Sequence, residues 1–192
     1  MKTSMTRRLL GGMLVLLLVS GVAWAQTAAD IAALRVKANA GDADAQYNLG
    51  LMYLKGQGVP QDYAQAVTWW RQAAEQGDAA AQSDLGVMYA TGQGVPQDDA
   101  QAVAWTRKAA DQGHALAQLN LGVMYANGKG APKVAVLAYM WFNLSAARGT
   151  GETQKTAASN RDGIAKTMTP QELAGAQTLA REWHAAFDAR LK

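Results

Sequence analysis

The sequence predicts an all-α fold, an α/α solenoid (superhelix) in which antiparallel helix pairs stack on one another behind a signal peptide. The first observation is internal repetition. The string that begins at Ala43 returns at Ala79 and at Ala115, and 24 of 36 positions are identical between the first two copies. A period of this length is typical of stacked supersecondary units. The second observation is that each copy carries two apolar stripes at helical spacing, separated by a segment rich in Gly and Pro.

These observations divide the chain into six segments. They are a signal peptide (1–25), an N-terminal capping helix (26–42), three repeats (43–78, 79–114 and 115–149) and C-terminal capping helices (150–192).

The first segment has the three parts of an export signal. Basic residues precede an apolar run of 14 residues, 9–22, and a small-x-small motif ends at Ala25. Because a helix needs about 20 apolar residues to span a bilayer, we expect cleavage after Ala25 and a periplasmic or secreted protein that starts at Gln26. An uncleaved anchor is the alternative. The choice between the general secretory and twin-arginine routes stays open.

Charge and cysteine content narrow the classes of function. The chain has 18 basic and 15 acidic residues, and cleavage would remove Lys2, Arg7 and Arg8 but no acidic residue. The mature chain would be neutral, so we expect neither a nucleic-acid partner nor a membrane partner. With no cysteine, thiol nucleophiles and thiolate metal sites are excluded, and we expect no cofactor and no metal. The two histidines, His114 and His184, lie far apart and are typical of surface or helix-end residues.

Each repeat reads as two helices. In the first copy, one stripe is Ala45, Leu49 and Tyr53, and the other is Ala66, Trp69, Ala73 and Ala74. Asp62 and Asp98 stand at N-cap positions of the second helices. Asp78 can cap the first helix of the next copy.

Small and large residues at fixed positions predict the packing. Gly50, Gly86 and Gly122 recur in the middle of the first helix, where Gly costs about 1 kcal/mol relative to Ala. This repetition indicates that a neighbouring helix passes too closely for a Cβ. We expect Trp69, Trp105 and Trp141 to fill the space between layers, and Trp70, whose equivalents are Thr106 and Phe142, to be the exposed position.

The third repeat predicts a role for the C-terminal region. Its second helix, 134–147, is apolar nearly all round, so another element must cover it. Residues 152–166 read as a helix. A further helix is expected to begin at Thr169-Pro170 with Glu172 completing a capping box, and to end near Asp188.

The recurring strings carry a family resemblance. Ala-x-Ala-Gln-x-x-Leu-Gly-x-Met-Tyr, Gly-x-Gly-Val-Pro-Gln-Asp and Ala-Ala-x-Gln-Gly resemble the Sel-one-like repeat, a relative of the tetratricopeptide repeat, over residues 43–149. The resemblance implies a tetratricopeptide-like solenoid that serves as an adaptor or scaffold. It also implies that the first helix of each pair lines the concave side.

Three functions fit these patterns. The favoured one is a non-enzymatic, envelope-located adaptor that binds a protein or peptide in the groove. The second is a cell-envelope enzyme, which would need titratable groups with perturbed pKa values converging on one cleft. The third is a structural subunit that self-associates through the apolar third repeat. The identity of the partner and the oligomeric state are not predicted.

The predicted binding residues lie on the first helices, to one side of the apolar stripe, and because they are three and four residues apart from one another they line up on one face. The rows combine amide, acidic and apolar side chains, and Asn48, Asp84 and Asn120 are expected to bind a peptide backbone. Together with Ala80, the predicted set is Asp44, Tyr47, Asn48, Leu51, Lys55, Ser83, Asp84, Val87, Thr91, Leu116, Leu119, Asn120, Val123 and Asn127.

Overall fold

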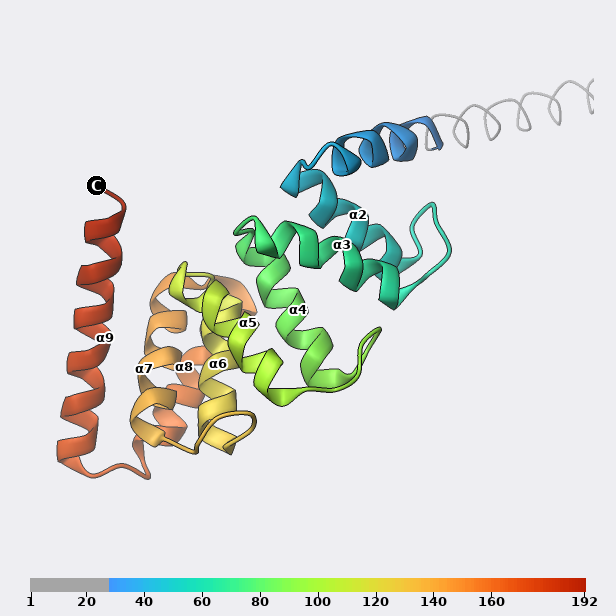
Figure 1. Cartoon of the computed structure of the whole chain (residues 1–192). Helices are drawn as coiled ribbons and strands as arrows, with labels where there is room; N and C mark the ends of the chain where they lie inside the picture. The colour runs from blue at the N-terminus through green and yellow to red at the C-terminus, as the bar shows by residue number, and fades with distance from the viewer. Residues whose placement is uncertain (1–27) are drawn as a thin grey trace, which may run out of the picture.

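The computed structural model describes residues 28–192, and within this range all regular secondary structure is helical (Figure 1). A helix over 28–39 comes first. It is followed by α2 (Ala43–Lys55), α3 (Tyr63–Glu75), α4 (Ala79–Thr91), α5 (Asp99–Asp111), α6 (Ala115–Asn127), α7 (Ala135–Arg148), α8 (Gly151–Ala165) and α9 (Pro170–Arg190). The predicted signal peptide lies outside the described residues.

Successive helices pair and stack in chain order. The pairs α2/α3, α4/α5 and α6/α7 correspond to the three repeats, and each pair packs on the next through the α3/α4 and α5/α6 contacts (Figure 1). The predicted α/α solenoid is therefore confirmed.

The predicted helix ends are present. Asp62 and Asp98 cap α3 and α5, and Asp78 accepts a hydrogen bond of 2.6 Å from the backbone N–H of Ala81. Each first helix ends on a glycine in the left-handed region, such as Gly56 at φ 66°, where a side chain would be strained. The N-cap residue of α7 is Val134, whose side chain makes no capping hydrogen bond.

The mid-helix glycines lie where the second helix of the same pair crosses. A Cβ added to Gly122 would lie 2.6 Å from the Phe142 ring, and one added to Gly86 would collide with Thr106. Gly50 faces Trp70 in the same way. The close approach predicted from these glycines is confirmed.

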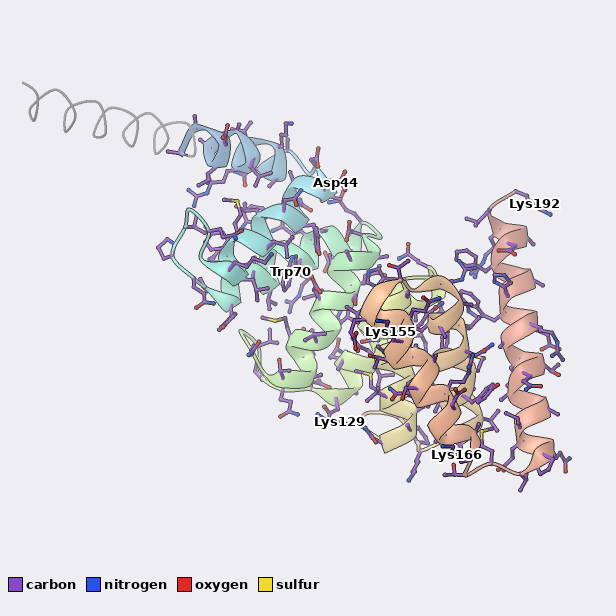
Figure 2. All side chains as sticks on the ribbon, turned by 180° about the vertical axis from the view of Figure 1, so that it is seen from behind. Asp44, Trp70, Lys129, Lys155, Lys166 and Lys192 are labelled. Atoms are coloured by element: carbon purple, nitrogen blue, oxygen red, sulfur yellow. The ribbon has the colours of Figure 1, made fainter. Side chains whose placement is uncertain are left out.

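The prediction for the tryptophans is wrong in one respect. Trp70 lies inside the first helix pair (Figure 2) and is 1% exposed. Trp69 and Trp105 are half-buried. The physical reason is that residue 70 and its equivalents face the mid-helix glycines within each pair. Trp69 and Trp105 do pack against the preceding layer, but they lie at its edge. Among Trp69, Trp105 and Trp141, only Trp141 is buried, because α9 covers it.

Buried glutamines connect neighbouring repeats. They occupy one position near the start of each first helix, and their Nε2 atoms donate to the last turn of the preceding helix. The bonds run from Gln46, Gln82 and Gln118 to the carbonyl oxygens of Ala38, Ala74 and Ala110 at 3.0, 2.9 and 3.1 Å. A buried side-chain amide without hydrogen-bond partners would be costly. The glutamine at this position therefore favours the stacking of each repeat on the helix that precedes it.

The C-terminal helices cover α7 as predicted. α8 packs against α6 and α7, and α9 lies along α7, where Trp183 meets Trp141 edge-on at 5.9 Å (Figure 1). The capping box at Thr169 and Glu172 is present. Arg148 at the end of α7 lies over the ring of Phe187, 4.0 Å from its centre, and so holds the far end of α9.

Candidate functional site: the groove face

The predicted rows lie on α2, α4 and α6, and we call the surface that they form the groove face. Most of its side chains are accessible. The exposed ones are Asp44, Asn48, Lys55, Val87, Thr91, Leu116, Val123 and Asn127, and the half-buried ones are Tyr47, Leu51, Ala80, Asp84 and Asn120.

Two members of the predicted set do not belong to this surface. Ser83 is 1% exposed and Leu119 is 7% exposed. Their position faces the second helix of the same pair, as Tyr47 shows by stacking on Trp70 with ring centres 6.3 Å apart. Neither side chain is available to a partner.

Tyr47 is engaged rather than free. Its hydroxyl donates a hydrogen bond of 3.2 Å to Asp84 Oδ2 on the next first helix. Burial raises the pKa of Asp84 to about 6, with a further contribution from the negative charge of Asp78, while the hydrogen bond from Tyr47 opposes the shift. Burial and the neighbouring Asp84 raise the pKa of Tyr47 to about 12. The pair therefore carries a carboxylate at neutral pH that is poorly solvated.

A hollow of about 220 Å³ lies between α4 and α6. Apolar side chains form most of its wall, and Thr106, Asn120 and Lys129 are the polar members. The lining residues are Val87, Ala90, Thr106, Asn120, Val123, Met124 and Lys129. Lys129 lies at the loop after α6 (Figure 2), and its Nζ is 3.5 Å from Asp99 Oδ1, so its charge is already paired.

A second hollow, of about 380 Å³, lies between α6 and α8. Val123 and Asn127 line it from α6, and Ser159, Asn160, Gly163 and Ile164 line it from α8. Val123 is common to both hollows. They therefore follow one another along the groove face, and α8 extends this face beyond the third repeat.

Sequence reasoning missed the residues on α8. The repeat motif is absent from this helix, so it was expected only to cap the stack. The repeat period of 36 residues could have identified them. Ser159 and Gly163 lie 36 residues after Val123 and Asn127, and all four line the second hollow. Thr106 was also missed, because it belongs to a second helix and is 1% exposed although it forms part of the hollow's wall.

The perturbed titratable groups do not form a metal site. Within residues 28–192, no three His, Asp or Glu side chains gather in a way that would hold a metal ion. In the same range, no helix is long and apolar enough to cross a bilayer. What the groove face offers is two hollows with mixed apolar and polar walls, together with the carboxylates of Asp44 and Asp84 elsewhere on the same face.

The comparisons with known proteins agree with this architecture. The Sel1 repeat model matches residues 43–78, 79–114 and 115–150. The chain is similar to a Sel1 repeat protein from Oxalobacter formigenes whose crystal structure is known, at 39% identity and a TM-score of 0.61, over 68% of this chain and 98% of that one.

A second similar structure is a protective antigen of uropathogenic Escherichia coli strains that displays an SLR fold. The identity is 30% and the TM-score 0.49, over 80% of this chain and 40% of that one. No curated protein matches the sequence.

The fold and the groove face place the protein in the class of helical-repeat solenoids. The chain belongs to the Sel1 repeat family. Proteins of this family typically mediate protein–protein interactions and generally act as non-catalytic scaffolds.

Proposed function

We propose that this chain is a non-enzymatic adaptor that binds a protein or peptide along the groove face. The observation that carries the proposal is a set of accessible apolar side chains on the groove face, two of which, Val87 and Val123, line its hollows. Val87, Leu116 and Val123 are 39, 42 and 37% exposed. Exposed apolar groups beside concave surfaces are typical of interaction sites.

Polar groups along the same surface suit a peptide backbone. Asn120 lines the first hollow from α6, and Asn127 on α6 and Asn160 on α8 both line the second. Each amide side chain offers both a donor and an acceptor, as an extended backbone requires. This combination favours a segment of extended chain as the ligand.

We further propose that the protein is exported and works in the bacterial cell envelope or outside the cell. The support is the signal-like first segment, with its basic residues, its apolar run over 9–22 and its small-x-small motif ending at Ala25. Intact mass of the exported protein is expected to correspond to a chain that begins at Gln26. A membrane-bound product that retains residues 1–25 would contradict cleavage.

The binding experiment is a crosslinked recovery of partners from the envelope fraction with the full chain as bait. The test variant is Val87→Asp/Val123→Asp, which places two charges in the groove face. The matched control is Ala100→Asp/Ala104→Asp, which places the same charges on exposed positions of α5. Circular dichroism establishes that both variants are folded.

We expect the groove variant to lose the partner that the wild type and the control recover. If the folded groove variant recovers the partner as well as the wild type does, the proposal is wrong. A partner lost only by the α5 variant would move the binding site to the opposite side.

A further inference from the structure

The helix over 28–39, which we call the N-terminal helix, has the register of the second helix of a repeat. Its Ala38 receives the hydrogen bond from Gln46 on α2, just as Ala74 of α3 receives one from α4. Within residues 28–192, no first helix precedes it in the chain. The stack therefore begins with a second helix that lacks its first.

At the other end of the stack, α8 has the register of a first helix. Gln154 lies 36 residues after Gln118, and its Nε2 donates a hydrogen bond of 3.4 Å to the carbonyl oxygen of Ala146 at the end of α7. α8 also packs against α6 and α7, as the first helix of a fourth repeat would.

α9 does not complete this fourth pair. It packs along α7, and its far end turns back to α5, where Arg190 donates a hydrogen bond of 3.4 Å to the carbonyl oxygen of Asp111. Thr178 of α9 has the position of Trp70 and Phe142 in the period, yet it is exposed. Figure 2 shows α8 in front and α9 to one side of it. One face of α8 therefore stays open.

A hollow of about 390 Å³ lies at this open face, between α7 and α8. Lys155 and Ala158 line it from α8, and they have the positions of Leu119 and Gly122 in the third repeat. There, Gly122 faces the Phe142 ring of the second helix. The open face of α8 is thus the surface that meets a second helix in a complete repeat.

The N-terminal helix has apolar side chains on the corresponding surface. Val36 has the position of Gln72, whose side chain is hydrogen-bonded to the first helix of its own repeat. Leu34 has the position of Trp70, which faces Gly50 on its first helix. Val36 is 69% exposed and Leu34 is half-buried. Both side chains therefore lie on the side that a first helix would cover.

The sizes of the facing residues also match. In the first and third repeats, a glycine of the first helix stands opposite a large ring, as Gly50 does opposite Trp70. α8 has Ala158 at the glycine position, and the N-terminal helix has Leu34 at the ring position. Because the alanine adds a Cβ, the side chain opposite it must be smaller, and leucine is smaller than either ring.

We propose that the chain associates head to tail, with the N-terminal helix of one copy packed on the open face of α8 of the next. A second copy is the occupant because its N-terminal helix has both the register and the side chains of the missing helix. This contact joins two different surfaces, so it adds copies in one direction instead of closing a dimer. The groove face would then continue from α8 of one copy to α2 of the next. The inference does not depend on which partner binds the groove face.

The test is sedimentation velocity of the exported protein from about 10 μM to about 1 mM. One contact between two helices is at the small end of protein interfaces, so we expect a Kd of about 100 μM. The weight-average mass should rise above that of one chain and keep rising with concentration. The mass of a single chain over the whole range would overturn the proposal, and so would a mass that levels off at two copies.

Two variants each block one end. Ala33→Arg/Val36→Arg places two charges on exposed positions of the N-terminal helix, where they would meet Lys155 of the next copy. Ala158→Arg places a long side chain at the glycine position of α8. Each variant alone should remain a single chain. An equimolar mixture should form a dimer and nothing larger, since the intact α8 of the first variant can receive the intact N-terminal helix of the second.

The matched control is Ala100→Arg/Ala104→Arg, with the same charges on exposed positions of α5, and it should associate as the wild type does. Circular dichroism shows whether each variant is folded. Should Ala158→Arg not fold, the loss of association in the N-terminal variant is the test. Association of a folded blocked variant on its own, or no dimer in the mixture of two folded variants, would overturn the proposal.

Discussion

Replacing Trp70 by alanine tests the packing within a repeat. The Trp70 ring is 1% exposed, it faces Gly50, and it stacks on Tyr47. Its Nε1 donates a hydrogen bond of 3.1 Å to the backbone oxygen of Tyr47. The residue therefore connects α2 and α3 by apolar contact and by one polar bond.

The expected cost follows from these contacts. Truncation of a buried Trp to Ala typically costs about 3–5 kcal/mol, and the hydrogen bond adds about 1 kcal/mol. We expect Trp70→Ala to lower the free energy of unfolding by about 4–6 kcal/mol. Trp70→Phe copies Phe142 in the third repeat, keeps most of the ring contact, and should cost about 1–2 kcal/mol.

The matched control is Trp105→Ala. Trp105 is half-buried at the edge of a layer, and the ammonium of Lys108 lies 4.1 Å from the centre of its ring. Its truncation should cost about 1–2 kcal/mol, since less apolar area returns to water. Urea unfolding followed by circular dichroism gives the three values, provided the m-values agree. A cost for Trp105→Ala equal to or greater than that for Trp70→Ala would refute this packing scheme.

Three further predictions concern titration and glycine. Burial raises the pKa of Asp84 to about 6. The contribution of the Asp84 side chain to the free energy of unfolding is therefore largest below about pH 4, where the carboxyl group is protonated, and is lost as the pH rises through about 6. Asp84→Asn should therefore raise the free energy of unfolding by on the order of 1–3 kcal/mol at pH 7.5 and have little effect at pH 4; equal effects at both would contradict the shift. Burial lowers the pKa of His114, whose Nδ1 accepts the capping hydrogen bond at the start of α6. The contribution of His114 to stability is therefore complete above about pH 6.5 and is lost as the pH falls through its pKa in the folded state. His114→Asn keeps a cap that does not titrate, so its melting temperature should stay constant over the acidic range in which that of the wild type falls. Gly122→Ala should destabilise the chain by about 1–3 kcal/mol because its Cβ meets the Phe142 ring, whereas Gly175→Ala, with open space around it in α9, should stabilise by about 1 kcal/mol; a stabilising Gly122→Ala would contradict the close crossing.

The fold was predictable because its signals are local and recur at a fixed period. Caps such as Asp62, turn glycines such as Gly56 and the capping box at Thr169 act within a few residues of their own position. The mid-helix glycines add a tertiary contact that each copy repeats.

The error at the tryptophans shows where comparison of the copies fails. Trp69 and its equivalents are identical in every copy and were expected to be the most buried, whereas residue 70 varies and was expected to be exposed. Residue 70 varies because it contacts residue 47 of the same repeat, and the two positions change size together, as Leu119 and Phe142 show. Variation between copies can therefore mark a compensated buried contact as well as a free surface.

The groove face was predictable only in part. The helical period placed Val87 and Val123 correctly on one surface. Periodicity does not show which offset positions turn toward the second helix, and so it misplaced Ser83 and Leu119. Each hollow depends on the sizes of side chains from three helices, α4, α5 and α6 for the first and α6, α7 and α8 for the second, and such volumes follow only from the assembled packing.

The most direct test of the adaptor function is photocrosslinking in living cells. Val123 lines both hollows, and Ala104 is exposed on α5. With p-benzoylphenylalanine at position 123, we expect ultraviolet light to join the chain to a discrete protein partner, and with the same group at position 104 we expect none. Crosslinking at position 104 alone, or at neither position in folded, exported protein, would contradict binding along the groove face.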